Sequence, residues 1–252
     1  MSSLAIQIDY ASNLALEVIK HILAENEKTS KIPEDDVAGP VTVANALADY
    51  FETAASIEEK DIELEGNGIS EFGHHGLDLL DRVSWQIRQL DIHDERDRIS
   101  RVYASLAVWL ARRGAVIENM ETVADSFAII VNSENDKAEL ANLCQLMEET
   151  LLAASETIKK DEDRSDPWRP WRVLNLNTGI AATRALDAKL MKQVFTELET
   201  RLPGDVSGFF ADGKRQMDAQ DVPQEIRDVL DEFVKKWPAI PAGTKIDFKN
   251  LQ

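Results

Sequence analysis

The sequence is poor in residues that interrupt regular structure or cross-link a chain. It contains 11 glycines and 8 prolines among 252 residues, which disfavours a turn-rich β-sandwich or barrel. Its one cysteine, Cys144, cannot form an internal disulfide, so nothing indicates an oxidising compartment. Cys144 lies between Leu143 and Leu146 in an apolar helical pattern, and this predicts a buried, unreactive thiol.

Long apolar runs are missing as well. No stretch approaches the roughly 18 consecutive apolar residues that a membrane span needs. Asp9 and Glu17 interrupt the N-terminal region, where a signal peptide requires an unbroken apolar segment. We therefore expect no membrane association and a cytoplasmic location.

Basic side chains are fewer than acidic ones in this chain. The chain has 46 acidic and 28 basic side chains, and its formal net charge is -18. A nucleic-acid-binding protein needs a positive field against the phosphates, and acids are interleaved wherever Lys and Arg gather in this chain. We expect no binding to nucleic acid. A basic partner is easier to accommodate, although strong acidity also serves solubility alone.

Helical spacing of apolar residues dominates the chain. Three consecutive amphipathic stripes begin at Val102, at Val116 after Gly114, and at Leu140, and the last runs to Ile158. Similar stripes lie near residues 8–25, 41–60, 70–90, 186–202, 209–217 and 226–237. No segment alternates long enough to predict a strand. About ten helices joined by short breaks predict an all-α fold of antiparallel neighbours.

Four residues at the centres of their stripes are predicted to be buried: Leu106, Phe127, Leu143 and Leu151. Each has apolar neighbours one helical turn before and after it, so it faces the same side as the rest of its stripe.

Three longer breaks interrupt the helical pattern, at residues 26–40, 63–73 and 161–171. The last reads DEDRSDPWRPW and is the best candidate for a boundary. It divides the chain into an N-terminal helical bundle, residues 1–160, and a C-terminal helical group, residues 161–252. We expect the two to pack as one unit.

The spacing of the helices suits a helical repeat. Helix starts near residues 95, 115 and 136 lie about twenty residues apart, so a helix pair spans about forty, the length of a helix-pair solenoid unit. No repeated signature of glycine, alanine and aromatic positions accompanies this spacing. An α-α superhelix and an irregular helical bundle therefore both fit the sequence.

The C-terminal stretch carries a series of packing residues at fixed spacing. The series consists of Arg184, Asp187, Leu190, Met191, Val194, Phe195, Leu202, Pro203, Phe209, Phe210, Gly213, Gln216, Met217, Asp218, Val222, Pro223, Ile226, Arg227 and Val229. This stretch resembles the tail of a group of uncharacterised bacterial helical proteins with a tetratricopeptide-like superhelix. The resemblance covers about a quarter of the chain, and it implies a fold but no catalytic residues.

The histidines suggest one enzymatic alternative. His75 and the pair His93–Asp94 match parts of an HD-type metal phosphohydrolase, in which such groups converge on a divalent ion that activates water. However, His93–Asp94 lies in a loop that enters a helix, and His75 shares an apolar stripe with Phe72 and Leu79. An all-α metal-dependent hydrolase stays the alternative, and we expect no metal and no other cofactor to be required. The common metal-binding, phosphate-binding and nucleophile-elbow motifs are missing.

The segment DPWRPW has the most unusual local composition, because Trp168, Arg169, Trp171 and Arg172 lie together in an acidic chain. Tryptophan and arginine are enriched at interface hot spots, and arginine stacks on an indole face. These four residues are the candidate partner-binding site. The alternative is that the tryptophans pin a long connection onto the core.

Acidic runs lie at residues 58–65 and 161–166. One interpretation is that they attract a basic peptide, and the other is that they are only solvated surface. The leading hypothesis is therefore a non-catalytic helical scaffold that binds a protein or peptide partner. Besides the hydrolase, a structural homo-oligomer is possible, in which exposed aromatic residues meet across a two-fold axis.

Overall fold

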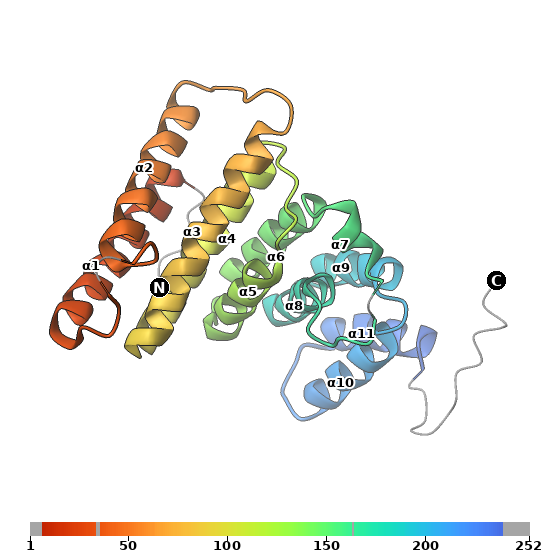
Figure 1. Ribbon diagram of the computed structural model, residues 1–252. Helices are drawn as coiled ribbons and strands as arrows, with labels where there is room; N and C mark the ends of the chain where they lie inside the picture. Colours follow the sequence, from red (N-terminus) through yellow and green to blue (C-terminus); the bar gives the residue numbers. More distant parts are fainter. Residues whose placement is uncertain (1–6, 34–35, 163, 239–252) are drawn as a thin grey trace.

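The computed structural model describes residues 7–33, 36–162 and 164–238 (Figure 1). Within these residues the chain forms eleven α-helices, one 3₁₀ turn and no strand, which confirms the expected all-α fold of about ten helices. The helices are α1 (Ile8–Thr29), α2 (Pro40–Glu59), α3 (Gly68–Leu90), α4 (Arg96–Arg112), α5 (Glu121–Ser133), α6 (Lys137–Leu152), α7 (Glu156–Lys160), α8 (Pro170–Ala185), α9 (Ala188–Arg201), α10 (Val206–Asp218) and α11 (Gln224–Lys236), and the 3₁₀ turn is η1 (His93–Glu95). No described helix has both the length and the apolar character to cross a membrane.

The first four helices pack together. Helix α1 contacts α2, α3 and α4, and α3 contacts α2 and α4 (Figure 1). Gly76 permits the close approach of α2 and α3, because a Cβ atom there would lie 2.2 Å from the Tyr50 ring. Tyr50 in turn stacks on Phe72, with ring centroids 4.3 Å apart. The predicted stripes of α2 and α3 therefore meet face to face.

Helix α4 connects this group to the rest of the molecule. Every residue from Ile99 to Leu110 is buried, and the helix contacts α1, α3, α5 and α6. Its sequence explains this burial, since small and apolar residues cover all of its faces after Arg101.

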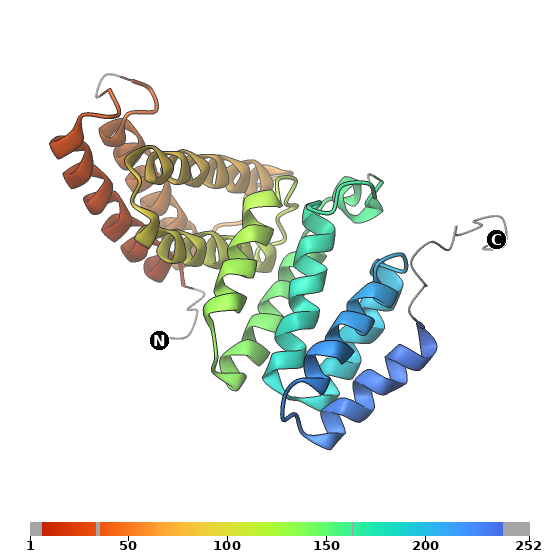
Figure 2. The same cartoon turned by 90° about the horizontal axis from the view of Figure 1, so that it is seen from below.

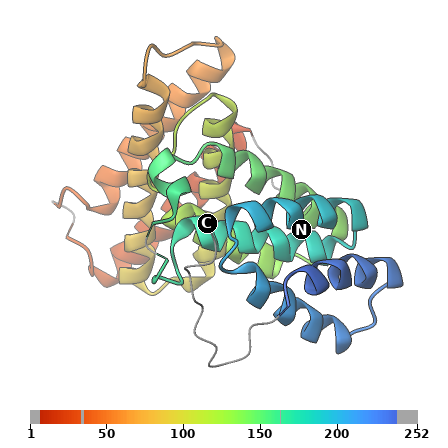
Figure 3. The ribbon, with the colours of Figure 1, turned by 90° about the vertical axis from the view of Figure 1, so that its right-hand side faces the viewer.

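The C-terminal helices continue away from α4 (Figure 2). Helix α8 packs on α5 and α6, which precede the boundary expected at residue 161, and it also packs on α9. Helices α10 and α11 lie side by side at the end far from α1 (Figures 2 and 3). Phe195, Phe210 and Phe233 join α9, α10 and α11 through ring centroids 4.9–5.3 Å apart.

The helical periodicity located the core correctly, but it misplaced two helix ends and predicted no stripe for α8. Leu106, Phe127, Leu143 and Leu151 are buried, as predicted. The second stripe was expected to start a helix at Val116, but α5 begins only at Glu121. The third stripe was expected to continue to Ile158, but α6 ends at Leu152 and a separate short helix, α7, follows.

Pairing between the two misplaced ends explains both errors. Ile117 and Ala154 form an isolated parallel bridge, in which the Ile117 N–H donates to the Ala153 carbonyl at 2.8 Å and the Ser155 N–H donates to the Ile117 carbonyl at 2.9 Å. These backbone groups are satisfied outside any helix, and apolar side chains such as Ile117 are buried all the same.

Cys144 is expected to be unreactive in the native protein. Its side chain is buried, and its Sγ donates to the Thr178 carbonyl at 3.5 Å. Burial, with a contribution from nearby Glu148, raises the pKa of the Cys144 thiol to about 12, so the reactive thiolate is scarce at pH 8. Ellman's reagent at pH 8 should label the thiol only after denaturant is added. Rapid labelling of the native protein would show that α6 opens without global unfolding.

Candidate functional site

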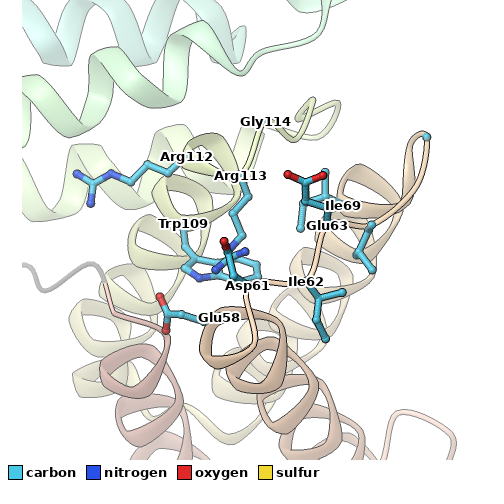
Figure 4. A pocket seen from close by; sticks show the side chains of 11 residues that line it. Glu58, Asp61, Ile62, Glu63, Ile69, Trp109, Arg112, Arg113 and Gly114 are labelled. Carbon is cyan, nitrogen blue, oxygen red and sulfur yellow. The ribbon is translucent and has the colours of Figure 1, made fainter.

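A cavity of about 710 Å³ opens where α2, the loop that follows it and the end of α4 meet (Figure 4). We call it the acidic pocket. It is lined by Glu58, Asp61, Ile62, Glu63, Leu64, Gly66, Ile69, Trp109, Arg112, Arg113 and Gly114.

The loop after α2 places a carboxylate at the pocket. Asp61 has φ +47°, a left-handed conformation that glycine usually takes at a helix end. The Asp61 N–H donates to the Glu58 carbonyl at 3.3 Å, and the Ile62 N–H donates to the Ile57 carbonyl at 3.0 Å, which closes the last turn of α2. Aspartate tolerates this conformation better than most residues. The turn therefore presents an acid where a glycine would present no side chain.

The end of α4 supplies the other wall. Gly114 has φ +78°, and the Ala115 N–H donates to the Leu110 carbonyl at 3.1 Å, so α4 ends in a glycine turn. This ending leaves Trp109 and Arg112 on the last turn of α4 and Arg113 directly after it, all of them lining the pocket.

Trp109 is the central aromatic group of the acidic pocket. Only 4% of its surface is exposed, and its Nε1–H has no hydrogen-bond partner among the described residues. The Arg113 guanidinium carbon lies 4.9 Å from the centre of the indole ring, and the Phe72 ring centre lies 6.4 Å from that of Trp109. Figure 4 shows Asp61 and Arg113 pointing into the pocket near Trp109. A buried indole N–H usually has an acceptor, so Trp109 carries an unsatisfied donor beneath the wall of the pocket.

The pocket carries a net negative charge. Glu58, Asp61 and Glu63 have no ion-pair partner among the described residues. Arg112 is neutralised by Glu149, since its Nε and Nη2 donate to the two carboxylate oxygens at 2.6 and 3.1 Å, and this hydrogen bonding raises the pKa of Arg112. Three carboxylates thus face the single guanidinium of Arg113.

A second cavity, of about 410 Å³, adjoins the acidic pocket and shares Arg112 and Gly114 with it. We call it the apolar pocket, because two exposed aliphatic side chains, Val116 and Leu152, line it. The Arg112–Glu149 ion pair lies at the border, since Arg112 lines both cavities and Glu149 the second. We call the two neighbouring pockets together the edge groove.

The predicted Trp-Arg site is divided by the fold. Trp171 and Arg169 are buried, Arg172 is partly exposed, and Trp168 is 75% exposed. Arg169 and Arg172 meet at one acid, because each donates to a carboxylate oxygen of Asp205, at 2.7 and 2.6 Å. Arg169, Trp171 and Arg172 therefore hold the connection between α7 and α8 against the protein. Of the four residues, Trp168 alone projects into solvent.

Arg169 also explains part of the second acidic run. Its Nε donates to Asp161 at 2.6 Å, and its Nη1 donates to the Asp166 carbonyl at 3.0 Å. Arg169 thus binds Asp161 and Asp166, the two ends of this acidic run, and joins them to Asp205 at the start of α10.

The structure does not bring the predicted metal ligands together. His75 lies within α3, where its ring contacts Tyr50, and His93 pairs with the exposed Asp91 beyond the end of α3. At 1.5 Å per residue, the helix between His75 and Leu90 spans about 22 Å. Asp94 instead lies near Glu95 and His21, with potential ligand atoms within 4.8 Å of one another.

The cluster of His21, Asp94 and Glu95 links α1 to the start of α4. The buried carboxylate of Glu95 accepts hydrogen bonds from His21 Nδ1 at 2.7 Å and from Arg98 at 2.8 Å. Arg98 already supplies a positive charge beside the Glu95 carboxylate. The cluster therefore fits a polar contact that holds α1 against the start of α4. Sequence reasoning missed His21, which lies 74 residues from its partner.

Comparisons with known proteins identify no relative. No family model matches the chain, no curated protein matches its sequence, and no solved structure matches its fold. The tetratricopeptide-like resemblance of the C-terminal stretch therefore stays a prediction, and the function has to be argued from the geometry of the sites.

Proposed function

We propose that this protein is a non-catalytic helical scaffold that holds an extended segment of a partner protein in the edge groove. Basic side chains of the segment occupy the acidic pocket, and an apolar side chain occupies the apolar pocket. The observation that carries this proposal is the set of unpaired carboxylates around Trp109, next to a cavity with exposed aliphatic residues.

The charge of the acidic pocket supports a basic occupant. Glu58, Asp61 and Glu63 come from one short stretch of chain and face the same cavity. A cationic side chain in the acidic pocket gains ion pairs with these carboxylates, which have no ion-pair partner among the described residues.

The shape of the edge groove supports a chain segment over a small molecule. Two cavities, of about 710 and 410 Å³, adjoin at Arg112, so an occupant that fills both must extend across the Arg112–Glu149 pair. An extended peptide places successive side chains in separate pockets while its backbone runs between them.

Binding of a basic peptide is expected to depend on the pocket carboxylates. The probe is a short fluorescent peptide with an arginine-rich half and a leucine-rich half, measured by anisotropy. The triple variant Glu58→Gln, Asp61→Asn, Glu63→Gln removes three exposed charge pairs worth about 0.6 kcal/mol each at the middle of the usual range, so affinity should fall about twentyfold. Asparagine at position 61 keeps the tolerance for a left-handed backbone.

A matched control removes the same number of charges elsewhere. Glu17→Gln, Glu27→Gln and Asp49→Asn change exposed acids on α1 and on the middle of α2. This control should retain affinity within about threefold, because remote charges are screened within about 10 Å at 0.1 M salt. Equal losses in both triple variants, or no binding to the parent protein, would contradict the proposal.

A further inference from the structure

A second groove, independent of the edge groove, lies between α8 and α10. It has a volume of about 440 Å³, and its apolar lining includes Leu176, Ile180 and Phe209. Gly204 and Gly208 also line it, and a Cβ atom at either position would meet nothing within 4 Å. Glycine lowers helix stability relative to alanine, and no contact with the described residues requires a glycine at position 208 in α10. The two glycines keep the groove open.

Trp168 is an exposed aromatic side chain held at a defined place. It is 75% exposed, and its backbone N–H donates to Asp166 Oδ1 at 2.8 Å. The next residue, Arg169, is buried in ion pairs with Asp161 and Asp205. Transfer of such a side chain out of water is worth about 1.5–3 kcal/mol, so a fixed and exposed indole favours association with a complementary surface.

Trp168 and the α8–α10 groove adjoin on one face of the molecule. Arg172 lines the groove, and its Nη1 donates at 2.9 Å to the carbonyl of Pro167, the residue before Trp168. Its Nε donates to Asp205, which also lines the groove. One chain therefore presents an unfilled apolar groove and an uncovered indole next to each other.

We propose that two copies of this chain associate about a two-fold axis, each placing Trp168 in the α8–α10 groove of the other. In a two-fold interface the same patch occurs on both subunits, so a patch that contains both the projecting group and its groove is self-complementary. Charge does not oppose the contact locally, because the charged residues that line the groove are two arginines and two aspartates, Arg172, Arg184, Asp205 and Asp212. This association leaves the edge groove free.

Added salt is expected to strengthen this dimer and to weaken peptide binding in the acidic pocket. Each copy carries a formal charge of -18, so two copies repel each other at low salt. Screening shortens the range of this repulsion from about 30 Å at 0.01 M salt to about 3 Å at 1 M. Salt should therefore strengthen the dimer, whereas it weakens a basic peptide in the acidic pocket.

Two substitutions test the contact from its two sides, with sedimentation velocity as the measurement of association. Trp168→Ala removes the projecting group and should weaken the dimer at least tenfold with no loss of melting temperature. Gly208→Leu fills the groove, where the added side chain begins in open space. Leucine is also a better helix former than glycine, so this variant should melt at or above the parent temperature and yet stay monomeric.

The control is Leu152→Ala, which removes an exposed aliphatic side chain from the apolar pocket and should leave the dimer intact. A parent protein that is monomeric up to about 100 µM would overturn the proposal and leave the groove to a different partner. A dimer that survives both Trp168→Ala and Gly208→Leu would overturn it as well.

Discussion

Replacement of Arg169 with alanine should lower the free energy of unfolding by about 3–5 kcal/mol. Arg169 is buried and lies between Asp161 and Asp205, whose side chains are largely buried too. Without the guanidinium, Asp161 is left without its cation, and Asp205 keeps only Arg172. Urea unfolding followed by circular dichroism measures the loss.

The control for Arg169 is an exposed ion pair of the same type. Arg215 pairs with Asp212 on α10, and the side chains of the two residues are 76% and 60% exposed. Arg215→Ala should cost about 0–1 kcal/mol, because surface ion pairs contribute little. If the two alanine variants unfold at the same urea concentration, Arg169 does not hold the segment onto α10.

Leu143→Ala should destabilise the protein by about 2–5 kcal/mol, because it leaves a cavity in the core. Leu143 is 2% exposed on α6, a helix that packs against both α4 and α8. The same helix offers a matched control, since Leu152 is 69% exposed and the substitution Leu152→Ala is chemically identical.

The control variant Leu152→Ala should change stability by no more than about 0.5 kcal/mol, as surface substitutions usually do. The measurement for both leucine variants is the midpoint of urea unfolding at an unchanged slope. Equal midpoints would mean that α6 presents a different face to the core, contrary to the burial of Leu143.

The helices and the core could be predicted because the helical period is a local signal. Leu106, Phe127, Leu143 and Leu151 were placed in the core from spacing alone, and all four are buried. The period does not distinguish a helix from an apolar loop with the same spacing, so Ile117 was assigned to a helix although it pairs with the chain near Ala154.

The sites could be predicted only in part, because they combine distant segments. The acidic run at residues 58–65 is a candidate attractant for a basic peptide from sequence alone, but no sequence pattern singles out its neighbour Trp109. Nothing local shows that the end of α4 lies beside the loop after α2. In the same way, composition treated Trp168 and Trp171 alike, whereas the start of α8 at Pro170 turns Trp171 inward and leaves Trp168 exposed.

The burial of α4 on every side has a consequence for the integrity of the whole chain. A fragment that ends before Arg96 would expose the faces of α1 and α3 that α4 covers, and a fragment that begins after Arg112 would expose those of α5 and α6. Because each half needs the same helix, neither can complete its own interior alone. The polypeptide is therefore indivisible at its centre, and a fragment that lacks α4 should not fold alone.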